Sequence, residues 1–416
     1  MALPTAPVTD PQTKVLPPDR EGKTATAAQW IKENLFRSLF DSVLTIIAVL
    51  FLFFALRLAL DWVFNLAQWD VITENINILM KGSYPGEQVW RIWLGLYLLG
   101  AIVGINLRAW NRELKRSTVA IAAIPLILAL LPLASESARL NLIIIQGTIA
   151  AAYLLTSIVA DQRRRQIASI TSILYIPALI VLLEGFTDEN GIMPLVKSDL
   201  WGGLLLSVLL AAVGIIFSLP LGIILALGRR SKQPAISALC ITYIEVVRGV
   251  PLISILFMGN IMLQLFMPQS LPPIDRVIRV MVAITLFTAA YMAEIVRGGL
   301  QAIPKGQYDA AYALGYSSLK SMRIIILPQA LRIVIPVIVS QFIGLLLDTT
   351  LVALVGLFDL LGIGQAILSN PNWLGRSQEV YVFIGLIYWI LATGMAFASQ
   401  RLEKTLGVGR NYDGAQ

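Results

Sequence analysis

The 416-residue sequence contains no histidine and only one cysteine, Cys240. Without histidine, the chain cannot build a Ser-His or Cys-His catalytic pair or a His-ligated metal site. A single cysteine also excludes an internal disulfide framework. We therefore expect neither a catalytic site nor a metal site in this chain.

Charged side chains are also scarce. They make up 14% of the sequence against 57% hydrophobic residues, whereas a soluble globular protein is about one quarter charged. Several apolar runs are long enough to cross about 30 Å of hydrocarbon as helices. We assign the formal net charge of +7 to cytoplasmic loops rather than to nucleic-acid binding. The composition predicts an all-α integral membrane protein that contacts lipid and has no nucleic-acid partner.

We expect about ten membrane spans, and the third and fifth are short enough to make the count approximate. The ten hydrophobic segments cover approximately residues 42–63, 92–108, 118–133, 142–160, 171–187, 203–228, 251–268, 277–297, 333–356 and 380–400.

The distribution of basic residues predicts the orientation of the spans. With both termini in the cytoplasm, the inner segments hold 24 lysines and arginines and the outer loops hold seven, while Arg57 lies within the first span. This asymmetry follows the positive-inside rule and places the loop 298–332 in the cytoplasm. Arg57 and Asp61 are four residues apart on one helix face, so we expect them to pair near the outer surface.

The chain is expected to divide near residue 200. Residues 1–37 are polar and contain five prolines, which predicts a disordered cytoplasmic tail rather than a signal peptide. Residues 38–199 would hold extra N-terminal spans, residues 200–405 the functional core, and residues 406–416 a second cytoplasmic tail.

A phosphate-binding loop is absent from the sequence. The segment Gly22-Lys23-Thr24 has Pro17, and not glycine, at the earlier position that such a loop requires. We therefore expect that this chain does not hydrolyse ATP.

The most informative pattern lies between Pro304 and Pro328. From residue 305 it reads Lys-Gly-Gln-Tyr-Asp-Ala-Ala-Tyr-Ala-Leu-Gly, and it ends in Ile-Ile-Leu-Pro. Helical spacing of apolar residues predicts a short amphipathic helix with Asp309 in its first turn, and Gly315 would allow a close approach or a bend. Such a helix can insert into a groove on a partner or lie on lipid headgroups. Its predicted apolar face contains Tyr308, Ala311, Tyr312, Gly315, Leu319 and Met322.

This loop resembles the cytoplasmic EAA loop of ABC-importer permeases, the helix that docks into the ATPase subunit. The motif Glu-x-x-Arg-Gly occurs twice, within 243–252 and within 291–299, and both segments resemble the two signature segments of polar amino acid ABC permeases. Segments 222–231 and 356–362 are similar to the general amino acid permease branch, whose members carry extra N-terminal spans. The resemblance covers residues 200–405.

The resemblance implies a type I importer fold in which the C-terminal five spans form the permease core and the coupling helix 304–328 moves as a rigid lever. It implies a dimer of ABC ATPase subunits that binds ATP and Mg²⁺, a second permease subunit that is a paralogue, and a periplasmic amino-acid-binding protein. This chain itself would hold no cofactor and would be a multi-pass protein of the bacterial inner membrane. The implied ATPase-coupling residues are Gln307, Tyr308, Asp309, Ala310, Ala311, Leu314, Gly315, Leu327 and Pro328.

Two positions depart from the family pattern. Asp309 stands where relatives usually have Glu, which keeps the charge and shortens the side chain by one methylene. Leu347 stands where relatives commonly have Lys, so a lysine that would hold a substrate carboxylate is missing from this subunit.

Acidic and polar residues inside the spans are candidates for the substrate pathway. Each Glu-x-x-Arg pair shares a helix face, so the two motifs can form structural ion pairs at the cytoplasmic gate or contact substrate. Asp348 is the deepest carboxylate, and it can bind an α-ammonium group or belong to a polar network that seals a subunit interface. The candidate pathway residues are Glu245, Glu294, Gln341, Asp348, Thr349 and Thr350.

The sequence predicts the permease subunit of an ATP-driven importer that moves amino acids, with polar L-amino acids favoured, from periplasm to cytoplasm. One alternative is an ion-coupled secondary amino acid transporter in which Asp348 and Glu294 are the coupling carboxylates. Another is a non-conducting structural subunit of a heterodimeric permease, which the leucine at position 347 keeps open.

Overall fold

The computed structural model describes residues 31, 34–110, 123–130, 135–188, 191–268, 270 and 273–406. This part of the chain is helical and contains only two isolated β-bridges, Thr187–Pro194 and Gly203–Asp359. The all-α expectation is confirmed. Within the described part, eight helices are long and apolar enough to cross a membrane, or nine if one bent pair counts as a span. The expected number of ten was approximate; half of the segment 118–133 and most of both tails lie outside the described residues.

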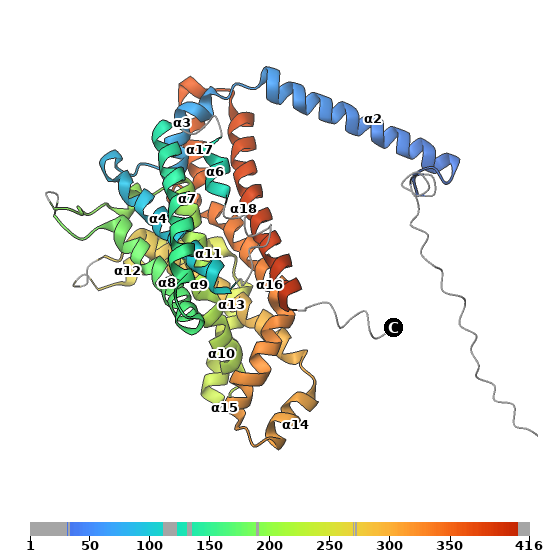
Figure 1. The fold of residues 1–416 in the computed structure, drawn as a ribbon, viewed down its shortest axis with the longest axis vertical. Helices are drawn as coiled ribbons and strands as arrows, with labels where there is room; N and C mark the ends of the chain where they lie inside the picture. Colours follow the sequence, from blue (N-terminus) through green and yellow to red (C-terminus); the bar gives the residue numbers. More distant parts are fainter. Residues whose placement is uncertain are drawn as a thin grey trace, which may run out of the picture. The chain divides into compact units, whose positions relative to one another are not determined.

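Figure 1 shows the helices in chain order. Their bounds are α2 Leu39–Asp61, α3 Asp70–Lys81, α4 Val89–Trp110, α6 Ile124–Ala129, α7 Glu136–Ser157, α8 Asp161–Glu184, α9 Gly203–Arg229, α10 Pro234–Gly249, α11 Leu252–Phe257, α12 Leu263–Phe266, α13 Arg276–Gln301, α14 Lys305–Ala313, α15 Ser318–Ser321, α16 Leu327–Asp348, α17 Leu360–Leu368 and α18 Ser377–Leu406. Short π-helical segments cover Trp62–Leu66, Met258–Met262 and Met322–Ile326, and 3-10 segments cover Gly86–Gln88, Ser198–Leu200, Thr349–Val355 and Pro371–Trp373.

The chain separates into two compact units, residues 1–68 and 69–416. The helix of the first unit, α2, has no buried residue. An apolar helix can face lipid on all sides, because its backbone groups are hydrogen-bonded to one another. Its N-cap is Ser38, which accepts a 3.0 Å hydrogen bond from the Asp41 amide. The predicted pair of Arg57 and Asp61 is not among the ion pairs of the described residues; the Asp61 carboxylate instead accepts a 2.7 Å hydrogen bond from Asn65 one turn further along.

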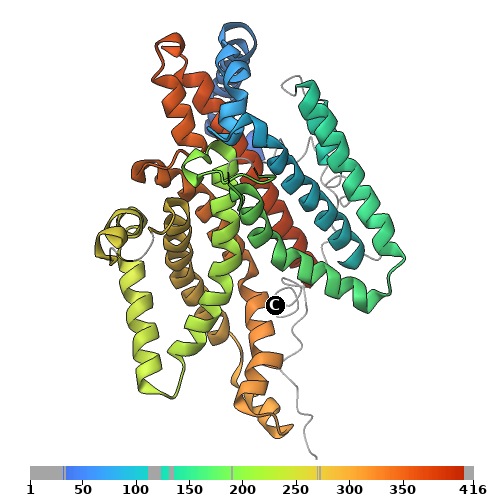
Figure 2. The same ribbon diagram turned by 90° about the vertical axis from the view of Figure 1, so that its left-hand side faces the viewer.

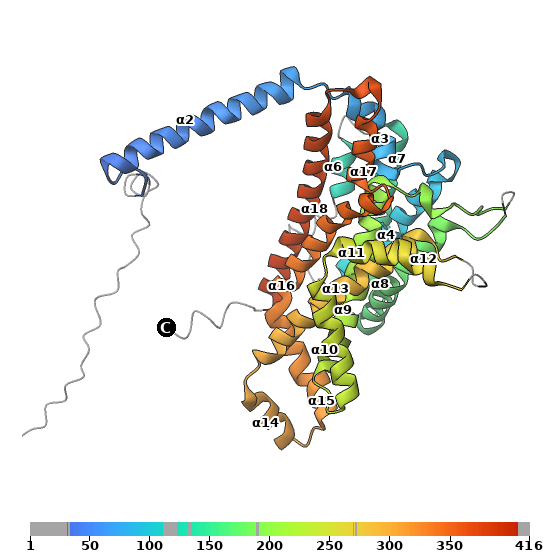
Figure 3. The same ribbon diagram turned by 180° about the vertical axis from the view of Figure 1, so that it is seen from behind.

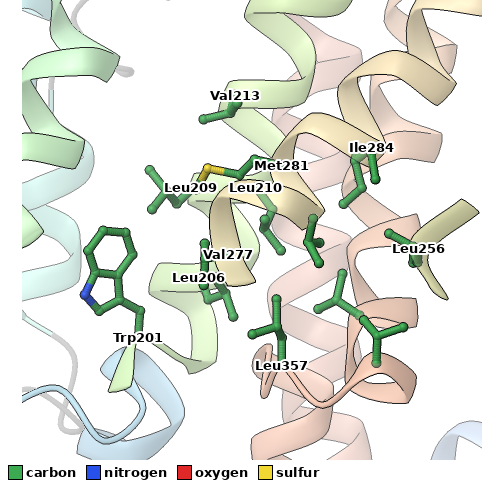
Figure 4. Close-up of a cluster of buried hydrophobic side chains, with 14 of the residues drawn as sticks. Trp201, Leu206, Leu209, Leu210, Val213, Leu256, Val277, Met281, Ile284 and Leu357 are labelled. Carbon is green, nitrogen blue, oxygen red and sulfur yellow. The ribbon is translucent and has the colours of Figure 1, made fainter. Parts of the chain in front are cut away.

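The centre of the second unit is the packing of α9 against α13. Figure 4 shows Leu206, Leu210 and Val213 of α9 beside Val277 and Ile284 of α13. Inside a membrane the two helices gain little from leaving water, so close packing has to hold them together. A β-carbon on Gly222 would lie 2.4 Å from the β-carbon of Met292, so only glycine permits this approach.

The expected span 251–268 is instead one arm of a bent pair. Helix α10 ends at Gly249, and the following helical stretch from Leu252 to Phe266 leaves at 108°. The bend follows from the sequence, because Val250 precedes Pro251 and is therefore extended, with φ −105° and ψ 135°.

Helix α3 packs with the C-terminal helices although it precedes them by more than a hundred residues. Val71, Ile72 and Leu79 are buried against α9, α17 and α18. Directly after α3, Gly82 has φ 62°, and a β-carbon there would lie 2.5 Å from the Gly202 Cα. The chain thus leaves this cluster at Gly82 and returns beside it at Gly202, so residues 83–201 form an insertion, here called the insert.

The insert has its own helix packing. Figure 2 shows α4, α7 and α8 grouped at one side of the remaining bundle. Small residues allow the contact, since a β-carbon on Gly104 would lie 2.3 Å from the Ile149 carbonyl oxygen. Helix α8 also contributes Ile176 and Leu183 to the central apolar cluster of α9 and α13. The insert therefore covers part of the outer surface of those two helices.

Candidate functional site

The predicted docking loop lies at the end of the bundle opposite α3 and α17 (Figures 1 and 3). Helix α14 begins directly after Pro304, so Asp309 is its fifth residue. The prediction that Asp309 lies in the first turn is therefore wrong. The helix stops at Ala313 and does not continue to residue 328. A second helical stretch starts at Ser318 and runs, with a π-helical segment, into α16.

Gly315 causes this break. Its φ of 76° is left-handed, and its amide donates a 2.9 Å hydrogen bond to the Tyr312 carbonyl. The next amide, of Tyr316, donates to the Ala311 carbonyl at 3.1 Å. These two bonds form a Schellman motif with glycine at its left-handed position. Gly315 therefore ends α14, and its predicted role in a close approach is not seen within the chain because a β-carbon there would meet nothing within 4 Å.

The inner side of α14 is attached to its own chain by three of the predicted coupling residues. Ala311 is 1% exposed, and Tyr308 packs on the apolar cluster formed by α9, α10, α13 and α16 at this end of the bundle. The Tyr308 hydroxyl donates to the Leu300 carbonyl at 3.4 Å. The Gln307 side-chain oxygen accepts a 3.2 Å hydrogen bond from Gln329 on α16. The single apolar face predicted for this loop is therefore divided.

The outer side of α14 is exposed. Asp309 and Ala310 are exposed, and the Asp309 carboxylate has no hydrogen bond or ion pair within the described part of the chain. Tyr312 is 50% and Leu314 75% exposed, so this side also presents apolar surface next to the carboxylate. The remaining predicted coupling residues, Leu327 and Pro328, belong to α16. Leu327 packs on the cluster below α14, and Pro328 lies at the start of α16, directly after the π-helical segment Met322–Ile326.

Next to α14, five charged residues form one network rather than the two separate pairs predicted. Glu294 pairs with Arg297 three residues later, as expected, but also with Arg229 at 3.5 Å and Arg248 at 3.7 Å. Glu245 does not pair with Arg248; its carboxylate accepts from Arg229 at 3.0 Å. The i, i+3 rule fails for Glu245 because the tertiary fold places the end of α9 between α10 and α13.

The six candidate pathway residues do not form one site. Glu245 and Glu294 belong to the network, whereas Asp348 ends α16, about 30 Å further along that helix from its first residue. Thr349 is fully buried, and its hydroxyl donates to the Leu346 carbonyl at 2.7 Å. The Thr350 hydroxyl donates likewise to the Leu347 carbonyl at 2.8 Å.

Gln341 and Asp348 share one side of α16, because seven residues make about two helical turns. Both are partly buried, and neither side chain has a hydrogen bond to any described residue. Leu347 beside them is 45% exposed. This side of α16 therefore carries an unpaired carboxylate and an unpaired amide within a span, where lipid is a poor partner for either.

Known proteins agree with this architecture. A family model described as "Binding-protein-dependent transport system inner membrane component" matches residues 218–408. The Escherichia coli (strain K12) protein "Inner membrane amino-acid ABC transporter permease protein YhdY" is 37% identical over 417 residues, which cover 96% of this chain and 99% of that protein. This chain belongs to the amino-acid ABC transporter permeases. A Rhodobacter capsulatus relative, "Glutamate/glutamine/aspartate/asparagine transport system permease protein BztC", is 36% identical over 421 residues, covering 91% of this permease and 94% of the relative.

A solved structure, "Crystal structure of an amino acid ABC transporter with histidines", has 29% sequence identity with this permease and a TM-score of 0.44. It covers 49% of this chain and 92% of that one. The family model and the two relatives confirm the family resemblance read from the sequence. A permease of this family is a multi-pass transport subunit of the inner membrane. Its transport systems include an ATPase and a substrate-binding protein.

The permease contains a buried polar node that the sequence reasoning missed. Asp359 is 0% exposed and caps α17, accepting hydrogen bonds from the amides of Gly362 at 2.9 Å and Leu361 at 3.3 Å. The Tyr388 hydroxyl donates to the same carboxylate at 3.1 Å and lies 3.3 Å from the Ser207 hydroxyl. The node thus joins α9, α17 and α18.

Burial raises the pKa of the Asp359 carboxyl above its ordinary value, against the opposing effect of its hydrogen bonds. The position could have been found from sequence, because an Asp immediately before an apolar helical segment is a common N-cap.

Proposed function

We propose that this permease docks an ABC ATPase through the exposed side of α14 and moves polar L-amino acids from periplasm to cytoplasm. The observation that carries the proposal is the two-sided character of α14. Its inner side is bonded to the chain through Gln307, Tyr308 and Ala311, while its outer side presents an unpaired carboxylate beside Tyr312. A short helix of this kind suits a groove on a partner.

The partner would supply the energy. The sequence of this permease has no phosphate-binding loop, so ATP and Mg²⁺ would bind to a dimer of separate ATPase subunits. Both termini would be cytoplasmic, which puts α14 on the ATPase side of the membrane. The outer loops would meet a periplasmic amino-acid-binding protein.

The unpaired polar side of α16 supports a second permease subunit, a paralogous chain, as the neighbour of this helix. Gln341 and Asp348 would then face a protein-lined pathway instead of lipid. Asp348 offers a carboxylate for the α-ammonium group of an amino acid. Since Leu347 offers no cation, the substrate carboxylate would be held by the other subunit. The name of the relative BztC, which includes glutamate, glutamine, aspartate and asparagine, supports polar amino acids as the cargo.

Co-purification from the native membrane tests the docking. We expect wild-type permease to bring an ATPase with it, and Asp309→Lys to lose that ATPase while its membrane insertion stays normal. Glu74→Lys is the matched control, because Glu74 is also an exposed acid and lies on α3 at the opposite end of the bundle. Unchanged recovery of the ATPase with Asp309→Lys would remove α14 from the interface.

Reconstitution separates the alternatives. Uptake driven by an ion gradient without any ATPase would establish a secondary transporter. If the complex assembles, Asp348→Asn should change the rate or selectivity of ATP-driven uptake, with Asp188→Asn in an outer loop as control. Wild-type uptake of all amino acids by Asp348→Asn would favour a subunit without its own substrate site.

A further inference from the structure

Two adjacent arginines at the end of α9 contact different elements. The Arg229 guanidinium bonds to Glu245 on α10 at 3.0 Å and to Glu294 on α13 at 3.5 Å. The guanidinium of Arg230 lies 3.3 Å from the Tyr308 hydroxyl of α14, with its carbon 5.9 Å from the centre of the tyrosine ring. One dipeptide therefore connects the docking helix with two helices of the bundle.

The backbone of this dipeptide is held in place. Ser237 on α10 donates a 2.9 Å hydrogen bond to the Arg229 carbonyl, and the Arg230 amide donates to the Leu227 carbonyl at 3.0 Å. One residue earlier, a β-carbon on Gly228 would lie 2.5 Å from the Cys240 sulfur, so the end of α9 is pressed against α10. Because consecutive Cα atoms are about 3.8 Å apart, a displacement of Arg230 also moves Arg229.

Glu294 is the centre of the network that Arg229 joins. Its side chain is 22% exposed and pairs with three arginines, Arg229, Arg248 and Arg297. It lies seven residues before the end of α13, about 10 Å along the helix from that end. A carboxylate so far inside a span is costly without its partners, so these pairs resist separation.

We propose that Tyr308, Arg230 and Arg229 form the link that carries displacement of α14 to Glu294 on α13 and Glu245 on α10. The link rests on the docking function proposed above and specifies its route inside the chain. The three residues are positioning residues for the transport step, because none of them needs to touch the substrate. ATPase closure would shift α14, the Arg229–Arg230 dipeptide would follow Tyr308, and the cytoplasmic ends of α10 and α13 would follow Arg229.

The decisive measurement is the number of ATP molecules hydrolysed per amino acid imported, in liposomes that contain the complete complex and its binding protein. We expect Arg230→Gln to keep the ATPase bound and hydrolysing while import falls by about tenfold, since one cation–π contact and one hydrogen bond are lost. Arg230→Lys should recover part of the import, because an ammonium group can still sit over the ring. Arg323→Gln, an exposed arginine of the same loop region, is the matched control and should couple normally.

A pair of variants tests whether the effect travels through the network. Arg230→Gln and Glu294→Gln act on opposite ends of one link, so their effects on the coupling ratio should not add in the double variant. Additive effects, or a wild-type coupling ratio in Arg230→Gln, would overturn the link while leaving ATPase docking intact. Loss of the ATPase from both Arg230→Gln and Tyr308→Phe would also overturn it, because the contact would then serve docking alone. If wild-type permease brings no ATPase with it, the docking proposal itself fails.

Discussion

Gly315 offers a test of how α14 is ended, because the effect of a side chain there is confined to the backbone. Its φ is 76°, and an added β-carbon would meet nothing within 4 Å. Gly315→Ala therefore introduces no clash, but an L-residue in the left-handed region costs about 1–2 kcal/mol. The cost falls on the two Schellman hydrogen bonds, from the amides of Gly315 and Tyr316.

Hydrogen exchange followed by mass spectrometry measures this local stability. A loss of about 1–2 kcal/mol corresponds to about 5- to 30-fold faster exchange of the amides that close the end of α14. Gly306→Ala is the matched control, because Gly306 is also surrounded by open space but lies inside the helix without a left-handed φ. That variant should not speed exchange, since alanine is the better helix former.

Gly315→Asn should lie between wild type and Gly315→Ala because asparagine tolerates the left-handed region. Equal exchange in wild type and Gly315→Ala, or the same acceleration in Gly306→Ala, would refute this account of the turn.

Two further predictions concern the rest of the fold. The raised pKa of Asp359 means that the folded state holds its proton more tightly than the unfolded state, so the thermal stability of purified permease should fall as pH rises through that pKa. Asp359→Asn keeps an N-cap oxygen but cannot titrate, so it should flatten the pH dependence of the melting temperature between pH 4 and pH 8. An unchanged pH dependence in this variant would mean that other groups cause it. Deletion of residues 83–201, joining Gly82 to Gly202, should yield a chain that still inserts and still binds the ATPase, with a lower melting temperature because the packing of α8 is lost. Failure of the shortened chain to insert would show that the insert is required for the bundle to form.

Much of the architecture could be predicted because its signals are local. Long apolar runs mark the spans, and the spacing around Asp309 marks the docking loop whatever the tertiary fold. The end of α14 at Gly315 also has a local sequence signal, since glycine directly after a helical segment commonly ends a helix. The sequence interpretation gave that glycine a packing role and extended the helix too far.

Other features depend on residues that are distant in sequence. Glu245 pairs with Arg229 and not with Arg248 three residues away, and this ion pair can form only when α9 packs against α10. The contact of Gly82 with Gly202 has no sequence signal, and α3 is too short and too polar to stand out as a span. The unpaired state of Asp348 likewise depends on which helices surround α16.

The insert also has a consequence in time. Ribosomes add about 5–20 residues per second, so α3 waits about 6–24 s between its own synthesis and that of its first partner, α9. Its contacts with α17 and α18 wait longer still. During this interval the apolar residues of α3 have no partner within the chain, and α4, α7 and α8 can associate first. During biogenesis of this permease the helices of the insert can therefore associate first, and the contacts of α3 are completed only when α18, the last span, has been made.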